Sequence, residues 1–223
     1  MEVEFISQGA LNAYCGDGKA EVLLFGFNGM GVVRYERELK GESSYFEQAA
    51  QLSKQTKGIV VCGCITDTRG DKRKSALVAE NGRLLGVTDR IHSIDGDFSC
   101  GATVRVYDTK IGKMGVLVAE DLYFYETVKA LTVCGSQFIV CPFDLPINSM
   151  ETAYLRVYAH AFGIPLYLCG KGYSALALPN GELAFSSPVS PVKTSLEKGA
   201  EYHLIQTRKR FIYQRGQSKE KND

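Results

Sequence analysis

The feature that most constrains the fold is a regular alternation of short apolar runs with segments of helical periodicity. Apolar runs of about four to eight residues are typical of buried strands, whereas an apolar residue every three or four positions is typical of an amphipathic helix. Their alternation predicts an α/β fold. Because no linker or internal repeat interrupts the pattern, we predict a single domain over residues 1–213, followed by a flexible polar tail at 214–223.

The strands are predicted from the runs rich in Val, Ile, Leu and Phe. They cover residues 21–27, 58–65, 75–79, 84–88, 104–108, 114–119, 138–141, 166–169, 173–178 and 183–185. Asn81-Gly82 lies between two of these runs, and this dipeptide is the strongest short-range signal of a β-hairpin. The Arg- and Lys-rich segment at 67–74 is predicted to be a polar turn.

Three helices are predicted from periodicity and end signals. Ser44 and Glu47 have the spacing of a capping box, which predicts a helix running to about Thr56. Apolar residues at helical spacing follow at 125–132 and 150–162, and the glycines Gly135 and Gly163 are expected to end these two helices.

The charge balance excludes several classes of partner. The chain has 26 basic and 25 acidic side chains, whereas a nucleic-acid-binding surface needs an excess of Lys and Arg. No apolar run approaches the ~20 residues that a membrane span requires. The N-terminus lacks the basic flank and apolar core of a signal peptide. We therefore expect a cytoplasmic protein that binds neither nucleic acid nor membrane.

The cysteines are predicted to be packed thiols. Seven is an odd number, so complete internal pairing is impossible, and free thiols are the rule in a reducing compartment. Cys62, Cys64, Cys141 and Cys169 lie in or end apolar runs, where a thiol behaves as a small buried hydrophobe. With one C-x-C pair and three His in the chain, no zinc site is expected, and no cofactor is predicted.

Several longer segments occur in the order found in one known family. They are AEVLLFGF at 20–27, IVVCGCI at 59–65, SALVAENGRLLGVTDRIH at 75–92, VYDTKIGKMGVLVAEDLYFYE at 106–126, LTVCGSQFIVCPFD at 131–144 and, more weakly, YSALALPNGELA at 173–184. The chain thereby resembles the nitrilase superfamily, the carbon–nitrogen hydrolases, and 106–126 is its most specific segment. This resemblance implies a four-layer α-β-β-α sandwich and a homodimer formed through the helical layers.

The resemblance also implies a catalytic triad of Glu, Lys and Cys. In that family the Cys thiolate attacks an amide or nitrile carbon, the Glu moves protons and the Lys stabilises the developing negative charge. Carried over residue by residue, the three positions hold Phe27, Arg90 and Ala119. Phe27 has no titratable proton, Arg90 keeps a positive charge but does not shuttle protons, and Ala119 offers no nucleophile.

The leading hypothesis is therefore a hydrolase-like protein without the family's chemistry, a pseudoenzyme with a binding, regulatory or assembly role. A small amide or carboxylate is the expected ligand class. The residues expected to line its pocket are Phe27, Arg90, Ala119, Glu120, Cys141 and Phe143.

Two alternatives stay open. In the first, the chain is an active amidase with relocated residues: Cys141 is the nucleophile, and the base is Glu120, Asp121, Asp144 or His92. In the second, the pocket is filled, because Phe27 occupies the volume of a substrate and Arg90 pairs with Glu120 or Asp121. Whether space remains beside Ala119 separates an open pocket from a filled one.

Overall fold

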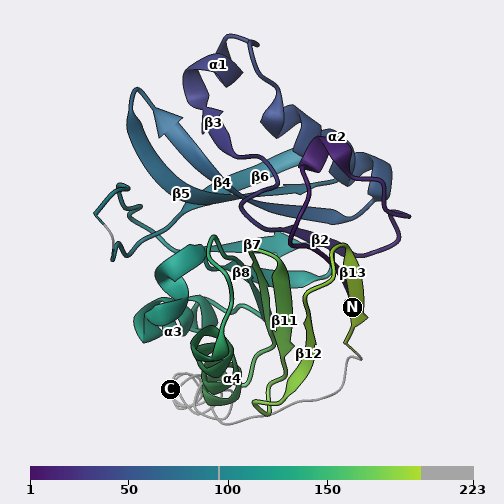
Figure 1. Ribbon diagram of the computed structural model, residues 1–223, viewed down its shortest axis with the longest axis vertical. Coiled ribbons are helices and arrows are strands. Elements are labelled where there is room, and N and C mark those ends of the chain that lie inside the picture. Colours follow the sequence, from purple (N-terminus) through teal and green to yellow (C-terminus); the bar gives the residue numbers. More distant parts are fainter. Residues whose placement is uncertain (95, 197–223) are drawn as a thin grey trace, which may run out of the picture.

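The computed structural model describes residues 1–94 and 96–196, which form two β-sheets packed face to face with helices on both outer faces (Figure 1). The layers follow one another as α-β-β-α, which confirms the predicted fold class. The predicted tail at 214–223 lies outside the described residues, so the boundary at residue 213 stays a prediction.

The first sheet has seven strands in the order β13-β1-β2-β4-β5-β6, with β3 paired to β4. The strands are β1 (Glu2–Ile6), β2 (Val22–Phe25), β3 (Val32–Arg34), β4 (Ile59–Thr68), β5 (Asp71–Glu80), β6 (Arg83–Asp89) and β13 (Val192–Ser195). Neighbouring strands β1, β2 and β4 run parallel to one another, whereas β4, β5 and β6 form an antiparallel meander. The predicted hairpin at Asn81-Gly82 joins β5 to β6 and is confirmed.

The predicted turn at 67–74 is wrong. Strands β4 and β5 continue through most of this segment, where Asp67 pairs with Lys72, and the chain turns only at Arg69 and Gly70. Both turn residues have positive φ, +55° and +91°. The strands were not predicted in this segment because its side chains are mostly charged, so it lacks the apolar run that is typical of a buried strand.

The second sheet has six strands in the order β12-β11-β10-β9-β8-β7. They are β7 (Arg105–Thr109), β8 (Gly112–Val116), β9 (Phe138–Pro142), β10 (Leu166–Gly170), β11 (Tyr173–Ala177) and β12 (Leu183–Ser187). Strands β8, β9 and β10 are parallel, and the outer pairs are antiparallel.

The helices cover the two outer faces. The first sheet carries α1 (Tyr35–Leu39) and α2 (Tyr45–Thr56), and the second carries α3 (Tyr125–Val133) and α4 (Ser149–Phe162), as Figure 1 shows. Two short 3-10 helices, η1 (Leu11–Ala13) and η2 (Ala119–Tyr123), follow strands. None of the helices in residues 1–94 and 96–196 is both long enough and apolar enough to cross a membrane.

The capping box predicted at the start of α2 does not form. Ser44 is the N-cap residue but its side chain accepts no capping hydrogen bond, and the Glu47 carboxylate accepts from Gln51 instead. The carboxylate of Glu38 accepts hydrogen bonds from the first two backbone N–H groups of α2, each at 3.1 Å. A residue six positions before the N-cap therefore satisfies these donors, because α1 places it against the helix end.

The core has three layers because the strands are buried on both faces. Leu24 and Val61 face the second sheet, whereas their neighbours Leu23 and Val60 face α2. A third cluster lies between the second sheet and helices α3 and α4. This two-sided burial explains why the strands read as continuous apolar runs.

All seven cysteines are free. Cys62, Cys64, Cys141 and Cys169 are buried, as predicted, and the other three are exposed.

Candidate functional site

Ala119 lies at a sharp turn between β8 and the 3-10 helix η2. It is fully buried, and its φ is +49°, in the left-handed region that residues other than Gly rarely occupy. Such strained strand-to-helix turns cost of order 1–3 kcal/mol and concentrate at functional sites. The position predicted for the nucleophile therefore has a strained backbone, of the kind found at functional sites, but a methyl side chain that cannot act as a nucleophile.

Next to Ala119, four charged side chains form a cluster between the sheets, called here the charge cluster: Lys74, Arg90, Glu120 and Asp144. Glu120 accepts a hydrogen bond from Arg90 Nη1 to Oε2 at 2.7 Å, and its Oε1 accepts one from Lys74 Nζ. Lys74 Nζ also lies 2.7 Å from Asp144 Oδ2. The Arg90 side chain is fully buried, and its Nη2 also donates to Ser93 Oγ at 3.2 Å and to the Phe98 carbonyl oxygen at 3.4 Å, so protein groups take the place of water around it.

Strand alternation brings the two cations together. Lys74 lies on β5 with the same orientation as Ala76 and Val78, which face the second sheet. Arg90 follows β6 directly opposite, and its backbone N–H donates to Lys74 O at 2.8 Å. Like charges at opposing positions destabilise a sheet. The Glu120 carboxylate, supplied by the second sheet, offsets this repulsion by placing one oxygen on each cation.

The ion pairs keep all members of this contact charged. Burial alone would lower the pKa of Lys74, but its bonds to Asp144 and Glu120 outweigh burial and raise that pKa. Burial would likewise raise the pKa of Glu120, but its bonds to Lys74 and Arg90 outweigh burial and hold that pKa below its usual value. The ring of Phe98 covers both cations, with its centroid 5.3 Å from Lys74 Nζ and 5.9 Å from Arg90 Cζ.

Lys74 was not among the predicted site residues, because the charged segment around it was predicted to be a turn. The period of two along β5 was the available signal, since it assigns Lys74 to the same face as Ala76 and Val78. Its partners were not predictable locally, because Lys74 and Glu120 are 46 residues apart in the chain.

Asp121 has a different role from its neighbour Glu120. Its buried carboxylate accepts hydrogen bonds from the backbone N–H groups of Ile91 and His92 and lies 3.1 Å from His92 Nδ1. Burial raises the pKa of Asp121 despite these contacts. The His92 ring stacks on Phe124 at a centroid distance of 3.9 Å. Asp121 therefore holds the segment that follows Arg90 against η2 through hydrogen bonds to its backbone. Arg90 itself pairs with the neighbouring Glu120.

Cys141 is the second-last residue of β9, the strand paired with β8, and its Sγ lies 3.9 Å from the carbonyl oxygen of Ala119. The side chain nevertheless packs in the cluster between the second sheet and the helices, together with Phe143. Burial, followed by the nearby charges of Asp121 and Glu120, raises the pKa of Cys141 well above its usual value. The thiol is thus protonated near neutral pH and has low nucleophilicity.

Phe27 packs against the edge of the core between the sheets, close to Gly63 of β4. A Cβ atom added at Gly63 would lie 2.6 Å from Phe27 Cδ2 and 3.0 Å from Pro142 Cβ. Gly63 is therefore needed for the ring to lie between β4 and β9. Of the pocket predicted from sequence, Arg90, Ala119 and Glu120 come together, Phe27 borders the same core, and Cys141 and Phe143 pack on the helix side.

Within residues 1–94 and 96–196, no three His, Cys, Asp or Glu side chains are placed to hold a metal ion.

The comparisons with known proteins agree on the fold. No family model matches the chain, and no curated protein matches it by sequence. Among solved structures, a mutant of the Nesterenkonia AN1 amidase from the nitrilase superfamily is 18% identical with a TM-score of 0.75, over 96% of both chains. The same amidase in complex with butyramide is 18% identical, with a TM-score of 0.73 over 96% of both chains. Saccharomyces cerevisiae Nit3, of branch 10 of the superfamily, is 15% identical with a TM-score of 0.72, over 95% of this chain and 94% of that chain. The chain therefore has the fold of nitrilase-superfamily structures.

Proposed function

We propose that this protein is a nitrilase-superfamily member that does not hydrolyse amides or nitriles and has a binding, regulatory or assembly role. The observation that carries the proposal is the charge cluster beside Ala119. Ala119 and Arg90 stand where the resemblance expects the nucleophile and the charge-stabilising Lys, and Arg90 is paired with Glu120, whose other oxygen contacts Lys74.

The groups of the charge cluster are poorly suited to acid–base chemistry at neutral pH. A general base works best with a pKa near the operating pH, and enzymes raise a Glu pKa to reach it. The pKa of Glu120 is shifted in the other direction, and that of Lys74 is raised further from neutrality. The cluster therefore supports a site whose charges neutralise one another.

The buried cysteines do not supply an alternative nucleophile. Burial raises the pKa of Cys64 and of Cys169 to about 12, and it raises the pKa values of Cys62 and Cys141 well above the usual value. A thiolate is the reactive form, so these four thiols are inert at neutral pH. In one mutant of the Nesterenkonia amidase, by contrast, acrylamide adds to the active-site cysteine.

A panel of aliphatic and aromatic amides and nitriles, tested with the purified protein, addresses the proposal directly. We expect no release of ammonia above that of a matched blank. The variant Cys141→Ala tests the alternative in which the chemistry has moved. Hydrolysis by the unmodified protein that Cys141→Ala or Glu120→Gln abolishes would overturn the proposal.

Alkylation provides a second, independent measurement. With iodoacetamide at neutral pH, we expect the exposed Cys15, Cys100 and Cys134 to react first. Peptide mass spectrometry identifies the sites. Stoichiometric modification of Cys141 ahead of these three would contradict a packed, protonated thiol at that position.

The assembly role is proposed to include a homodimer formed through α3 and α4. These helices carry exposed apolar side chains on the outer face of the second sheet, namely Tyr125, Val133, Met150 and Val157. A charge at Val157 would be desolvated in such an interface. We expect Val157→Glu to elute as a monomer in light-scattering chromatography, whereas Leu39→Glu, an exposed change on α1, leaves a dimer intact. A monomer before any substitution would contradict this part of the proposal.

A further inference from the structure

A second concave region lies on the first sheet, toward the tip of the β4–β5 hairpin, and its lining residue Lys72 is two positions before Lys74 of the charge cluster. Strand β3 and α1 stand at the top of Figure 1, next to the end of the β4–β5 hairpin. They form a cleft with the start of α2, and its volume is about 590 Å³. Ligand sites commonly have volumes of roughly 300–1,000 Å³, so the cleft is large enough for a small molecule.

Three cations converge on this cleft from three elements. Arg34 ends β3, Arg37 lies on α1, and Lys72 lies on β5. The acidic side chains that line the cleft are Glu42 and Asp67. The lining therefore carries one more positive than negative charge.

Each guanidinium group forms an ion pair at the cleft, Arg34 with Asp67 and Arg37 with Glu42, and keeps its hydrogen-bond donors open to a ligand. Arg34 Nε lies 3.8 Å from Asp67 Oδ2, and Arg37 Nε lies 3.8 Å from Glu42 Oε2, both beyond hydrogen-bonding distance. Within the described residues, neither guanidinium donates a hydrogen bond, and more than half of each side chain is exposed. The Asp67 carboxylate already accepts from the Gly70 N–H at 2.8 Å, so it does not depend on Arg34.

The start of α2 contributes side chains but no backbone donors. Glu38 already occupies the N–H groups of Tyr45 and Phe46. Ser44 Oγ accepts a hydrogen bond from Gln48 at 3.1 Å, which leaves the hydroxyl hydrogen of Ser44 to donate toward the cleft. The ring of Tyr45 and the half-exposed side chain of Val32 provide apolar surface.

We propose that this cleft binds a small organic anion through an oxyanion group, either a phosphate or a carboxylate. Planar guanidinium groups bind both kinds of oxyanion through paired N–H donors, and Lys72 adds a third positive charge. Tyr45 and Val32 contact the apolar part of the ligand. The site is separate from Ala119 and does not depend on the absence of hydrolysis.

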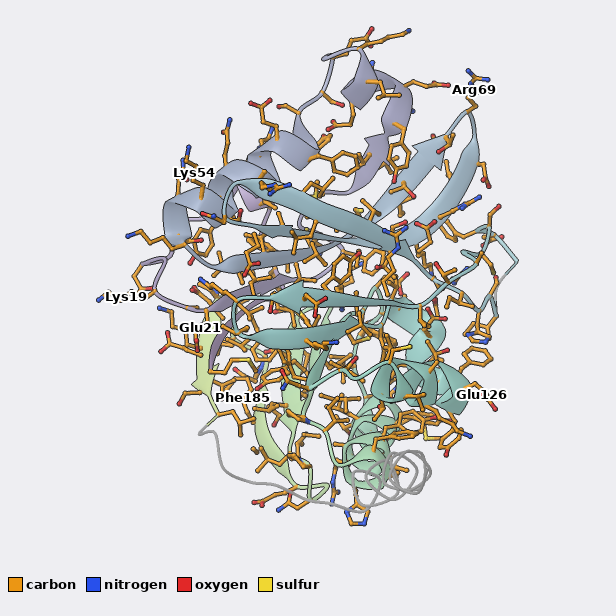
Figure 2. All side chains as sticks on the ribbon, turned by 180° about the vertical axis from the view of Figure 1, so that it is seen from behind. Lys19, Glu21, Lys54, Arg69, Glu126 and Phe185 are labelled. Atoms are coloured by element: carbon orange, nitrogen blue, oxygen red, sulfur yellow. The ribbon has the colours of Figure 1, made fainter. Side chains whose placement is uncertain are left out.

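A basic region at the other end of α2 gives a matched control. Lys54, Lys57 and Lys110 line it with Glu80 as the acidic partner. Figure 2 shows Lys54 and Arg69, the latter at the tip of the β4–β5 hairpin, projecting on opposite sides of the first sheet. This region holds no Arg, and Lys110 Nζ already donates to the backbone oxygen of Lys57. General charge attraction would favour both regions, whereas of these two regions the cleft alone has guanidinium groups in its lining.

Isothermal titration calorimetry with phenyl phosphate, benzoate and inorganic phosphate tests the proposal. We expect saturable one-to-one binding of phenyl phosphate or benzoate, and the tighter of the two identifies the oxyanion that the cleft prefers. Losing the charge-assisted bonds in the double variant Arg34→Gln/Arg37→Gln should weaken binding by about tenfold or more. The control Lys54→Gln/Lys57→Gln removes the same charge and should leave the affinity unchanged.

Two outcomes would overturn the proposal. One is the absence of saturable binding by all three probes, and the other is an equal loss of affinity in both double variants, which indicates charge attraction alone. Circular dichroism checks that each variant is folded. Should Arg34→Gln/Arg37→Gln not fold, Lys72→Gln, which changes an exposed side chain, replaces it under the same criteria.

Discussion

The Glu120 side chain forms ion pairs that connect the two sheets. Its two carboxylate oxygens contact one cation each, and both cations come from the first sheet. Removing one partner from a buried ion pair is far more costly than removing a surface pair, because the remaining charge stays buried. The cluster therefore makes strong predictions about single substitutions.

Glu120→Gln is expected to lower the free energy of unfolding by about 3–5 kcal/mol, because the two buried cations Lys74 and Arg90 each lose the ionised oxygen that Glu120 gives them. Urea denaturation followed by far-UV circular dichroism measures the change. The control is Asp108→Asn, which removes an exposed pair with Lys113 and should cost less than about 1 kcal/mol. Similar costs for both substitutions would contradict the assigned role of Glu120.

The same contact predicts a pH dependence. Since the pKa of Glu120 is lowered in the folded protein, its stabilisation is present above the unfolded value of about 4.3 and is lost as the pH falls through the folded value. The pKa of Lys74 is raised, so its stabilisation is present below about 10.4 and is lost as the pH rises through the folded value. The stability difference between the unmodified protein and Glu120→Gln should therefore be constant near neutrality and shrink below about pH 4.

Asp121 titrates in the opposite sense, because burial raises its pKa and its ionised form costs stability. It is present in both proteins, so comparing them isolates Glu120. Denaturation midpoints measured from pH 3 to pH 8 provide the test. An unchanged difference at acid pH would show that Glu120 is not the titrating group.

Helix caps show how an element can keep its predicted bounds while its end contacts differ from expectation. Helix α2 has a capping-box sequence but is capped by Glu38. Helix α4 forms the full box: Asn148 Oδ1 accepts from the Met150 N–H at 2.7 Å, and Glu151 accepts from the Asn148 N–H at 2.8 Å. Both helices bury one apolar face, and this face rather than the cap sets their position.

Strand β4 carries Gly63 under the ring of Phe27, and this contact can be tested. Gly63→Ala is expected to lower the free energy of unfolding by about 1–3 kcal/mol, because the new methyl group overlaps the ring. In a Phe27→Ala background the cost should be smaller, although Pro142 still lies nearby. Thermal or urea denaturation of the four proteins of this cycle gives the coupling. Equal costs in both backgrounds would contradict the packing of Phe27 on β4.

The inter-sheet core joins the two halves of the chain. It contains residues from both sheets, among them Leu24 of β2 and Tyr167 of β10, so neither sheet buries its inner face alone. The edge pairing of β1 with β13, where Glu2 lies opposite Ser195, also connects the two ends of the described chain. We therefore expect both sheets to unfold together.

Leu24→Ala is expected to lower the free energy of unfolding by about 2–5 kcal/mol while preserving a single transition. Far-UV circular dichroism follows the backbone, and tyrosine fluorescence follows the twelve tyrosines, since the chain has no Trp. The two midpoints should coincide and shift together. Leu39→Ala, on the exposed surface of α1, is the control. Separate transitions for the two probes would contradict a single cooperative domain.

Local patterns determined much of the fold. Apolar runs marked most strands of both sheets, Asn81-Gly82 marked the hairpin, and helical spacing located α2, α3 and α4. These features depend on neighbours within a few residues, which is the range that periodicity and turn chemistry describe. Strands β1, β3 and β13 were not predicted. β3 and β13 are short and pair with one neighbour each, whereas β1 lies inside the sheet but has its apolar run interrupted by Glu4.

The contacts of the candidate site could not be predicted from neighbouring residues alone. The sequence by itself determined that Arg90, Ala119 and Glu120 deserved comparison with a catalytic site, and that four cysteines would be buried. Only the tertiary structure decided that Lys74 joins them, that Cys141 packs on the helix side, and that Arg34, Arg37 and Lys72 share a cleft. The physical reason is that these contacts form between separate strands and helices, so they exist only once the sheets have packed and the side chains have lost their water.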